Sequence, residues 1–178
     1  MANKLELTWV GKESELKIEP RLLIENPELS NTAQDSKTEN MIIHGDNLLA
    51  LKALESQYAG QVKCIYIDPP YNTGSAFENY DDGIEHSIWL NLMYHRLLIL
   101  NNLLAEDGTI WITLDDNEAH YCKVLCDQIW TRKNFIADVI WNSRKSVSND
   151  AILSLNTNHI LVHAKNVEII TIINSENL

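Results

Sequence analysis

Glycine is scarce in this sequence, and its few residues are scattered. The 178 residues contain six glycines, and no two of them are close enough to share a turn. They are Gly11, Gly45, Gly60, Gly74, Gly83 and Gly108. Loops in which the backbone comes close to a bound ligand need glycine, because a side chain there would fill the space. The sequence therefore contains no glycine-rich ligand-binding loop.

Basic residues are also few. Lysine and arginine number 14 against 25 aspartates and glutamates, which gives a formal net charge of −11. Contacts to phosphates need lysine and arginine, so the shortage of these residues should weaken sequence-independent affinity for nucleic acid. The acids gather in residues 1–40 and 78–85, and the only mildly basic region follows residue 130. If the chain handles DNA, most phosphate contacts must come from another surface.

Long apolar runs are missing too. Residues 1–6 lack the apolar core of a signal peptide. The longest apolar helix candidate, at residues 85–104, is interrupted by asparagine, histidine and arginine, so it does not suit a membrane span. We therefore expect a soluble, cytoplasmic chain.

Cysteine occurs only three times, at Cys64, Cys122 and Cys126. An odd number of cysteines in apolar segments indicates reduced thiols rather than a disulfide framework. A metal site of Cys122, Cys126 and the nearby His120 is conceivable. Burial of the two thiols in a packed helix face is favoured.

The most informative stretch present is residues 62–74. Residues 62–67 are mostly apolar, with β-branched and aromatic members, which predicts a strand buried on both faces. Asp68 comes where that strand should end. It is followed by two prolines and a tyrosine, Pro69, Pro70 and Tyr71. Because ligands bind beyond the carboxyl ends of strands in open α/β sheets, Asp68 is placed where chemistry is expected.

The two prolines give this acid a defined setting. Proline has no N–H and pushes the preceding residue into an extended conformation, so Asp68 and Pro69 are held extended. A carboxylate beside a free carbonyl suits a group with two N–H donors, such as the exocyclic amine of a nucleobase. Hydrogen bonds from both N–H groups of the amine to these two acceptors localise the nitrogen lone pair. The Asp68 charge stabilises positive charge that develops on that nitrogen. Tyr71 offers a face for stacking the base; the alternative is a rigid turn with a solvated acid.

This motif resembles that of a known enzyme family. Asp68-Pro69-Pro70-Tyr71 matches the catalytic motif of amino-methyltransferases that modify adenine N6 or cytosine N4 in DNA. The longer run 67–74, with residues 45–48, looks like the modification (Mod) subunits of type III restriction systems and their β-class relatives. The resemblance covers residues 41–166 and implies a site-specific DNA methyltransferase with these four catalytic residues. Aspartate rather than serine at position 68 favours adenine N6, with cytosine N4 left open.

The resemblance also implies a cofactor and partners. In the family an acid at the end of the preceding strand faces the adenine of S-adenosylmethionine, and Asp46, beside Asn47, matches that position. The alternative is that Asp46, or Asn47 in its place, caps the following helix. The implied partners are DNA, a second Mod subunit in a homodimer and a restriction subunit. No membrane contact and no metal are expected, since amine methylation needs no metal.

The expected elements alternate between strands and helices. Strands are predicted at residues 41–44, 62–67, 109–114, 135–141 and 159–164, and helices at 48–58, 85–104 and up to about 130. This order predicts an α/β fold, an incomplete doubly wound (Rossmann-like) methyltransferase sheet with an antiparallel closing pair. The predicted parts are an irregular N-terminal extension, a catalytic half and a short tail: residues 1–40, 41–166 and 167–178. A short amphipathic piece is expected near residues 22–24.

Other polar residues have structural interpretations. Asp115 and Glu118 form a capping-box pattern, which favours capping over catalysis for Asp115 and Asp116. His159 and His163 share one face of a predicted strand, where packing or edge positions are favoured over metal ligation.

The absent glycine-rich loop agrees with the permuted order of the β class. There the catalytic half comes first and the recognition domain and glycine-rich half follow, so we expect an N-terminal piece that is inactive alone. The strand at 62–67 should then have an open edge that promotes aggregation or dimerisation. Two alternatives stay open. One is a non-catalytic remnant that pairs with an intact subunit, and the other is a metal-dependent hydrolase using Asp68, Asp81 and Asp82.

Overall fold

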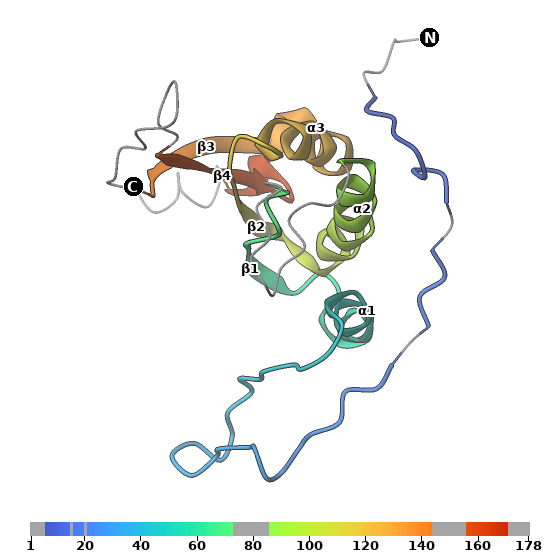
Figure 1. The fold of residues 1–178 in the computed structure, drawn as a ribbon. Coiled ribbons are helices and arrows are strands. Elements are labelled where there is room, and N and C mark those ends of the chain that lie inside the picture. Colours follow the sequence, from blue (N-terminus) through green and yellow to red (C-terminus); the bar gives the residue numbers. More distant parts are fainter. Residues whose placement is uncertain (1–5, 15, 20, 73–85, 144–155, 171–178) are drawn as a thin grey trace, which may run out of the picture.

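A computed structural model describes residues 6–14, 16–19, 21–72, 86–143 and 156–170. Within them the chain forms three complete α-helices, one short 3-10 helix and four strands (Figure 1), and residues 167–170 are also helical. The helices are α1 (Asn47–Tyr58), α2 (His86–Leu103) and α3 (Ala119–Trp130), with the 3-10 turn at Arg132–Asn134. The strands are β1 (Val62–Ile67), β2 (Leu104–Leu114), β3 (Phe135–Asn142) and β4 (Thr157–Ala164).

The strands form one mixed sheet in the order β1-β2-β4-β3. β1 and β2 run parallel, with Tyr66 opposite Trp111. β4 pairs antiparallel with both β2 and β3. The predicted α/β class and the antiparallel closing pair are therefore confirmed.

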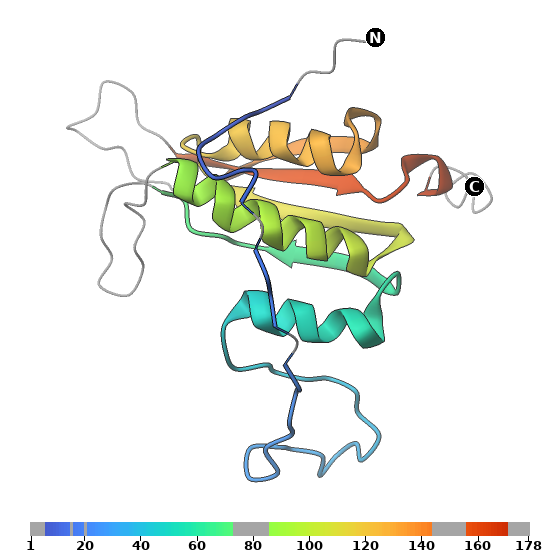
Figure 2. The same ribbon diagram turned by 90° about the vertical axis from the view of Figure 1, so that its right-hand side faces the viewer.

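The core lies between this sheet and the helices α2 and α3, which cover one of its faces (Figure 2). Its largest fully buried side chains come from α2, α3 and the two central strands. They include Trp89, Leu90, Leu97, Ile110, Ile112, Leu125 and Leu161. Gly108 sits at a tight approach of β1 to β2, because a Cβ there would lie 2.7 Å from the carbonyl oxygen of Val62.

β1 differs from the expected doubly buried strand. Only Ile65 is buried, while the Tyr66 side chain is 60% exposed and Cys64 is exposed. The reason is its place in the sheet: in the described part of the chain β1 pairs with β2 alone and forms the edge. The open edge agrees with the sequence, whereas dimerisation through it stays a prediction.

The segment before α1 is irregular, as predicted. Residues 6–14, 16–19 and 21–46 contain no helix or strand. The expected strand at 41–44 is wrong, since Ile42 is fully exposed and has no partner strand, and the amphipathic piece is wrong because Leu22 and Ile24 are exposed. Trp9 nevertheless fastens this segment to α2, because its Nε1 donates to Asn91 Oδ1 at 2.9 Å.

Element boundaries shift most around β2. The sequence predicts a helix over residues 85–104 and a strand only from residue 109, but β2 already begins at Leu104. Cys122 and Cys126 are fully buried on α3 with their Sγ atoms 4.0 Å apart, as the packing interpretation expects. Burial raises the pKa of Cys126, so this thiol stays protonated at neutral pH. No helix in the described ranges is both long and apolar enough to pass through a bilayer.

His163 on β4 packs inside the core, which confirms its interpretation as a packing residue. Its ring is fully buried against Trp130 and Phe135, and its Nε2 lies 3.5 Å from Asp127 Oδ1. Burial lowers the pKa of His163 to about 4, although Asp127 opposes the shift. The imidazole is therefore neutral in the folded protein at pH 7.

This pKa predicts a specific acid sensitivity. The unfolded His163 takes up a proton near pH 6.5 and the folded one only near pH 4, so stability falls as the pH drops through that window. The loss amounts to about 3 kcal/mol at its full extent. The variant His163→Leu should show a flatter dependence of unfolding free energy on pH, measured by urea denaturation at several pH values. Equal slopes for both proteins would contradict the prediction.

Candidate active site

Asp68 and the three residues after it lie at the carboxyl end of β1. The parallel neighbour β2 ends at this same end of the sheet. Asp68 is exposed, while Pro69, Pro70 and Tyr71 are partly buried. The acid is therefore presented to solvent by a segment whose other residues are anchored, as the sequence predicts for a site residue.

Two hydrogen bonds anchor this segment to the rest of the fold. The fully buried Trp89 of α2 donates from Nε1 to the Pro70 carbonyl at 2.6 Å. Asn158 of β4 donates from Nδ2 to Tyr71 Oη at 3.2 Å. These bonds leave the Asp68 carboxylate exposed at the end of β1, with the Tyr71 hydroxyl as its hydrogen-bond partner.

The Tyr71 phenol stays protonated. Burial, a hydrogen bond with Asp68 and the negative charge of Asp68 all raise its pKa, and only the Asn158 contact opposes them. Tyr71 therefore supplies no base near neutral pH. Its chemical contribution is an aromatic face and a hydroxyl that links Asp68 to β4.

A buried carboxylate holds Asn72, the residue directly after Tyr71. Glu118 is 1% exposed, and its Oε1 accepts from Asn72 Nδ2 at 2.8 Å. His86 Nδ1, at the start of α2, lies 2.9 Å from the same oxygen. Asn72 has φ +57°, a left-handed conformation that asparagine tolerates better than most residues. Glu118 thus joins the segment 68–72 to α2 and α3.

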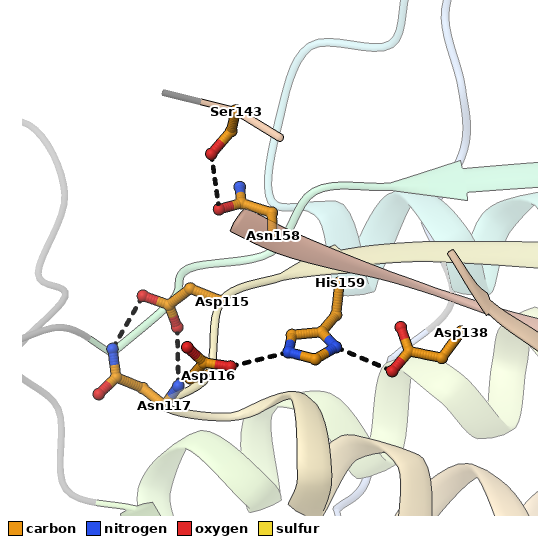
Figure 3. Close-up of polar contacts among 7 residues, drawn as sticks. All are labelled: Asp115, Asp116, Asn117, Asp138, Ser143, Asn158 and His159. Carbon is orange, nitrogen blue, oxygen red and sulfur yellow. Dashed lines mark hydrogen bonds and ion pairs between the residues drawn. The ribbon is translucent and has the colours of Figure 1, made fainter. Parts of the chain in front are cut away.

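The predicted capping box does not form. Because the sequence assigns Glu118 to that box, its contacts with Asn72 and His86 are not predicted. Glu118 is the N-cap residue of α3 but makes no side-chain capping bond. Asp115 accepts instead from the backbone and side chain of Asn117, at 3.0 and 2.8 Å (Figure 3). Asp116 caps nothing and contacts His159. The local pattern of acids held no signal for Glu118, because its partners Asn72 and His86 lie far away in the sequence.

Asp46 is the N-cap of α1. Its Oδ1 accepts from the backbone N–H groups of Leu48 and Leu49 at 3.0 and 3.1 Å. Asn47 Oδ1 accepts from Arg96 Nε at 2.8 Å, so Asn47 is tied to α2. The capping interpretation of Asp46 is confirmed. The exposed carboxylate has a second oxygen that fits an amine donor, so capping and contact with a cofactor adenine are compatible.

A second polar cluster lies at the same end of the sheet. His159 of β4 is held between two acids, with Nε2 2.8 Å from Asp116 Oδ1 and Nδ1 2.8 Å from Asp138 Oδ2 (Figure 3). Partial burial opposes protonation, but the hydrogen bonds to the two acids prevail and raise the pKa of His159. Neither a packing role nor an unpaired edge position describes this residue.

Some predicted residues lie outside the described ranges. Asp81 and Asp82 of the hydrolase alternative are among them, as are Thr73 and Gly74. Two cavities in the described part measure about 280 and 200 Å³. The first lies between residues 16–21 and α1, and the second lies beside Tyr94 and Ile129; neither includes Asp68.

A family model described as DNA methylase (N6/N4 methyltransferase) matches residues 62–176, from the first residue of β1 to beyond β4. The chain belongs to the DNA methylase family. The match includes the Asp68 segment, Glu118 and the cluster around His159.

Several proteins similar to this methylase chain are Mod subunits of type III restriction-modification enzymes. The "Probable type III restriction-modification enzyme HindVI Mod subunit" of Haemophilus influenzae is 42% identical over 79% of the chain and 19% of its own length. The EcoP15I Mod subunit of Escherichia coli is 33% identical over 91% of the chain and 30% of its own length. The chain thus spans less than a third of the length of these relatives.

Solved methyltransferase structures resemble the methylase chain more distantly. The PvuII cytosine-N4-specific DNA methyltransferase is 14% identical, with a TM-score of 0.47, and the match covers 66% of this chain and 47% of that one. The M1.HpyAVI–SAM complex is 16% identical, with a TM-score of 0.47, over 70% and 54% of the two chains.

Proposed function

We propose that this chain carries the catalytic segment of a site-specific DNA adenine-N6 methyltransferase of the Mod type. The observation that carries the proposal is the exposed Asp68 carboxylate at the carboxyl end of β1, followed directly by Pro69, Pro70 and the anchored Tyr71. Membership of the DNA methylase family and identity to Mod subunits support it. The substrate is DNA, and residues 41–166 form the catalytic half.

The chain's own residues act on the target amine. The Asp68 carboxylate and the Pro69 carbonyl each accept a hydrogen bond from one N–H of the amine. These two bonds draw the nitrogen lone pair out of conjugation with the ring. The Asp68 charge stabilises the positive charge that develops on nitrogen, and its carboxylate can take up the proton that leaves. Tyr71, held by Asn158, offers its face to the extruded base. Asp68, Pro69, Pro70 and Tyr71 are thus the proposed catalytic residues.

S-adenosylmethionine is the proposed cofactor, and when bound it supplies an electrophilic methyl group. Asp46 fits its adenine amine through the carboxylate oxygen that does not cap α1, with Asn47 beside it. The sequence has no glycine-rich loop for the remainder of the cofactor. We therefore propose that transfer needs a second segment with that loop, and that the chain alone is inactive. A Mod homodimer and a restriction subunit are the proposed protein partners.

Product analysis tests this proposal. A Mod-length protein that contains residues 1–178 is incubated with duplex DNA and methyl-labelled S-adenosylmethionine, and the nucleosides are separated by mass spectrometry. We expect N6-methyladenine, and no product from residues 1–178 alone. N4-methylcytosine would overturn the assignment to adenine. Absence of both products from the longer protein would overturn the function.

A further inference from the structure

Three side chains from different elements converge at the end of the sheet where β1 and β2 end, the same end at which residues 68–72 lie. Asp116 follows β2, His120 lies in the first turn of α3, and His159 lies on β4. Each offers one ligand atom, and these atoms all lie within 4.8 Å of one another. The rings of His120 and His159 meet edge to face, with centroids 5.5 Å apart. Residues distant in the chain thus form a compact set of nitrogen and oxygen donors.

We propose that Asp116, His120 and His159 bind one divalent transition-metal ion, with Zn²⁺ as the best-fitting ion. Two imidazoles and one carboxylate are a common ligand set of zinc, and water then fills the fourth tetrahedral position. Imidazole donors favour zinc, copper and nickel over Mg²⁺ and Ca²⁺, which prefer oxygen. The site uses neither Asp68 nor Tyr71, so it is separate from the proposed methyl transfer.

Asp138 supplies the feature that distinguishes this cluster from a chance ion pair. Its Oδ2 lies 2.8 Å from His159 Nδ1 and can accept a hydrogen bond from it (Figure 3). Nε2, which lies 2.8 Å from Asp116 Oδ1, is then the nitrogen that gives up its proton to bind an ion. Metal-binding histidines usually donate their second nitrogen to a carboxylate in this way, which fixes the tautomer and ring orientation. Asp138 therefore positions the His159 ring and does not itself bind the proposed ion.

The ligands need only a small adjustment to admit the ion. His159 Nε2 and Asp116 Oδ1 are 2.8 Å apart, whereas two ligand atoms at zinc bond lengths in a tetrahedron are about 3.3 Å apart. The Asp116 side chain is 42% exposed and His120 is also exposed, so both can move outward. The His159 ring is only 12% exposed and stays in place as the fixed ligand.

Binding would tie the β2–α3 connection to β4. Asn158, which holds Tyr71, is the residue directly before His159. An occupied site would therefore stiffen the strand that supports the catalytic tyrosine without adding a group to the reaction. The proposed role of the ion is structural.

Calorimetric titration of the untagged full chain with ZnSO₄, after removal of metal by chelation, tests the site. We expect one ion per chain, and at least about tenfold weaker binding by each of His120→Gln and His159→Gln. Asp138→Asn should weaken binding by about tenfold, as loss of an outer carboxylate does. His44→Gln, which removes an exposed histidine of the N-terminal segment, is the matched control and should bind as the parent does. MgCl₂ at the same concentrations should give no binding heat.

Thermal melting separates loss of the ligand from loss of the fold. His120 is exposed, so metal-free His120→Gln should melt at the same temperature as the metal-free parent. Zn²⁺ should raise the melting temperature of the parent and of His44→Gln, but not that of His120→Gln. The proposal is overturned if the parent binds no Zn²⁺, if His44→Gln and His120→Gln weaken binding equally, or if Mg²⁺ binds as well as Zn²⁺.

Discussion

Replacing Asp68 with alanine should lower methyl transfer about a thousandfold in a Mod-length protein that contains this chain. The change removes both an acceptor for the target amine and the charge that stabilises positive nitrogen. Loss of one such preorganised group typically costs about 10²–10³ in rate, and here two effects fall together. Single-turnover methylation of duplex DNA measures the loss without interference from product release.

Stability should hardly change in this variant, since Asp68 is exposed and supports no buried group apart from its contact with Tyr71. Asp35→Ala, an exposed acid in the N-terminal segment, is the matched control and should keep full activity. Asp68→Asn retains one acceptor oxygen and should fall between the two. A wild-type rate of methyl transfer in Asp68→Ala would contradict the catalytic role proposed for Asp68.

Replacing Glu118 with alanine should produce the largest loss of stability among the polar substitutions considered. Glu118 is almost fully buried, and its removal leaves the amide of Asn72 and the ring of His86 without their acceptor. Stranding partly buried donors of this kind costs about 2 kcal/mol, or roughly 6 °C in melting temperature for a chain of this size. Urea and thermal denaturation of the chain measure it.

The same substitution should also disturb the catalytic segment, because Asn72 directly follows Tyr71. We expect kcat to fall with little change in KM for DNA, since no phosphate contact is lost. Glu106→Ala, an exposed glutamate on β2, is the control and should change stability by less than about 0.5 kcal/mol. Similar losses for Glu118→Ala and Glu106→Ala would refute the supporting role.

Local chemistry explains which features the sequence predicts well. The position of Asp68 at a strand end follows from an apolar run and two prolines, both of which act within a few residues. The helices α2 and α3 follow from apolar spacing in the same way. The class of fold follows from the order of these elements, which is also readable along the chain.

Features that depend on distant partners are predicted poorly. The strand expected at 41–44 has the right residues but no neighbour to pair with in the described part of the chain. The apolar run of β1 predicts burial on both faces, although the strand lies at the open edge that the missing half of the sheet implies. Glu118 follows Asp115 at capping-box spacing, yet its side chain turns to Asn72 and His86, 46 and 32 residues away. The group around His159 likewise forms only when β2, β3 and β4 come together.

The exposure of Cys64 on the edge strand has a practical consequence. Both other thiols are fully buried on α3, so the folded protein offers one reactive sulfur in its natural sequence. A fluorophore or spin label attached there would sit on the open rim of the sheet. It would report directly when another strand docks against β1, with no engineered mutation needed.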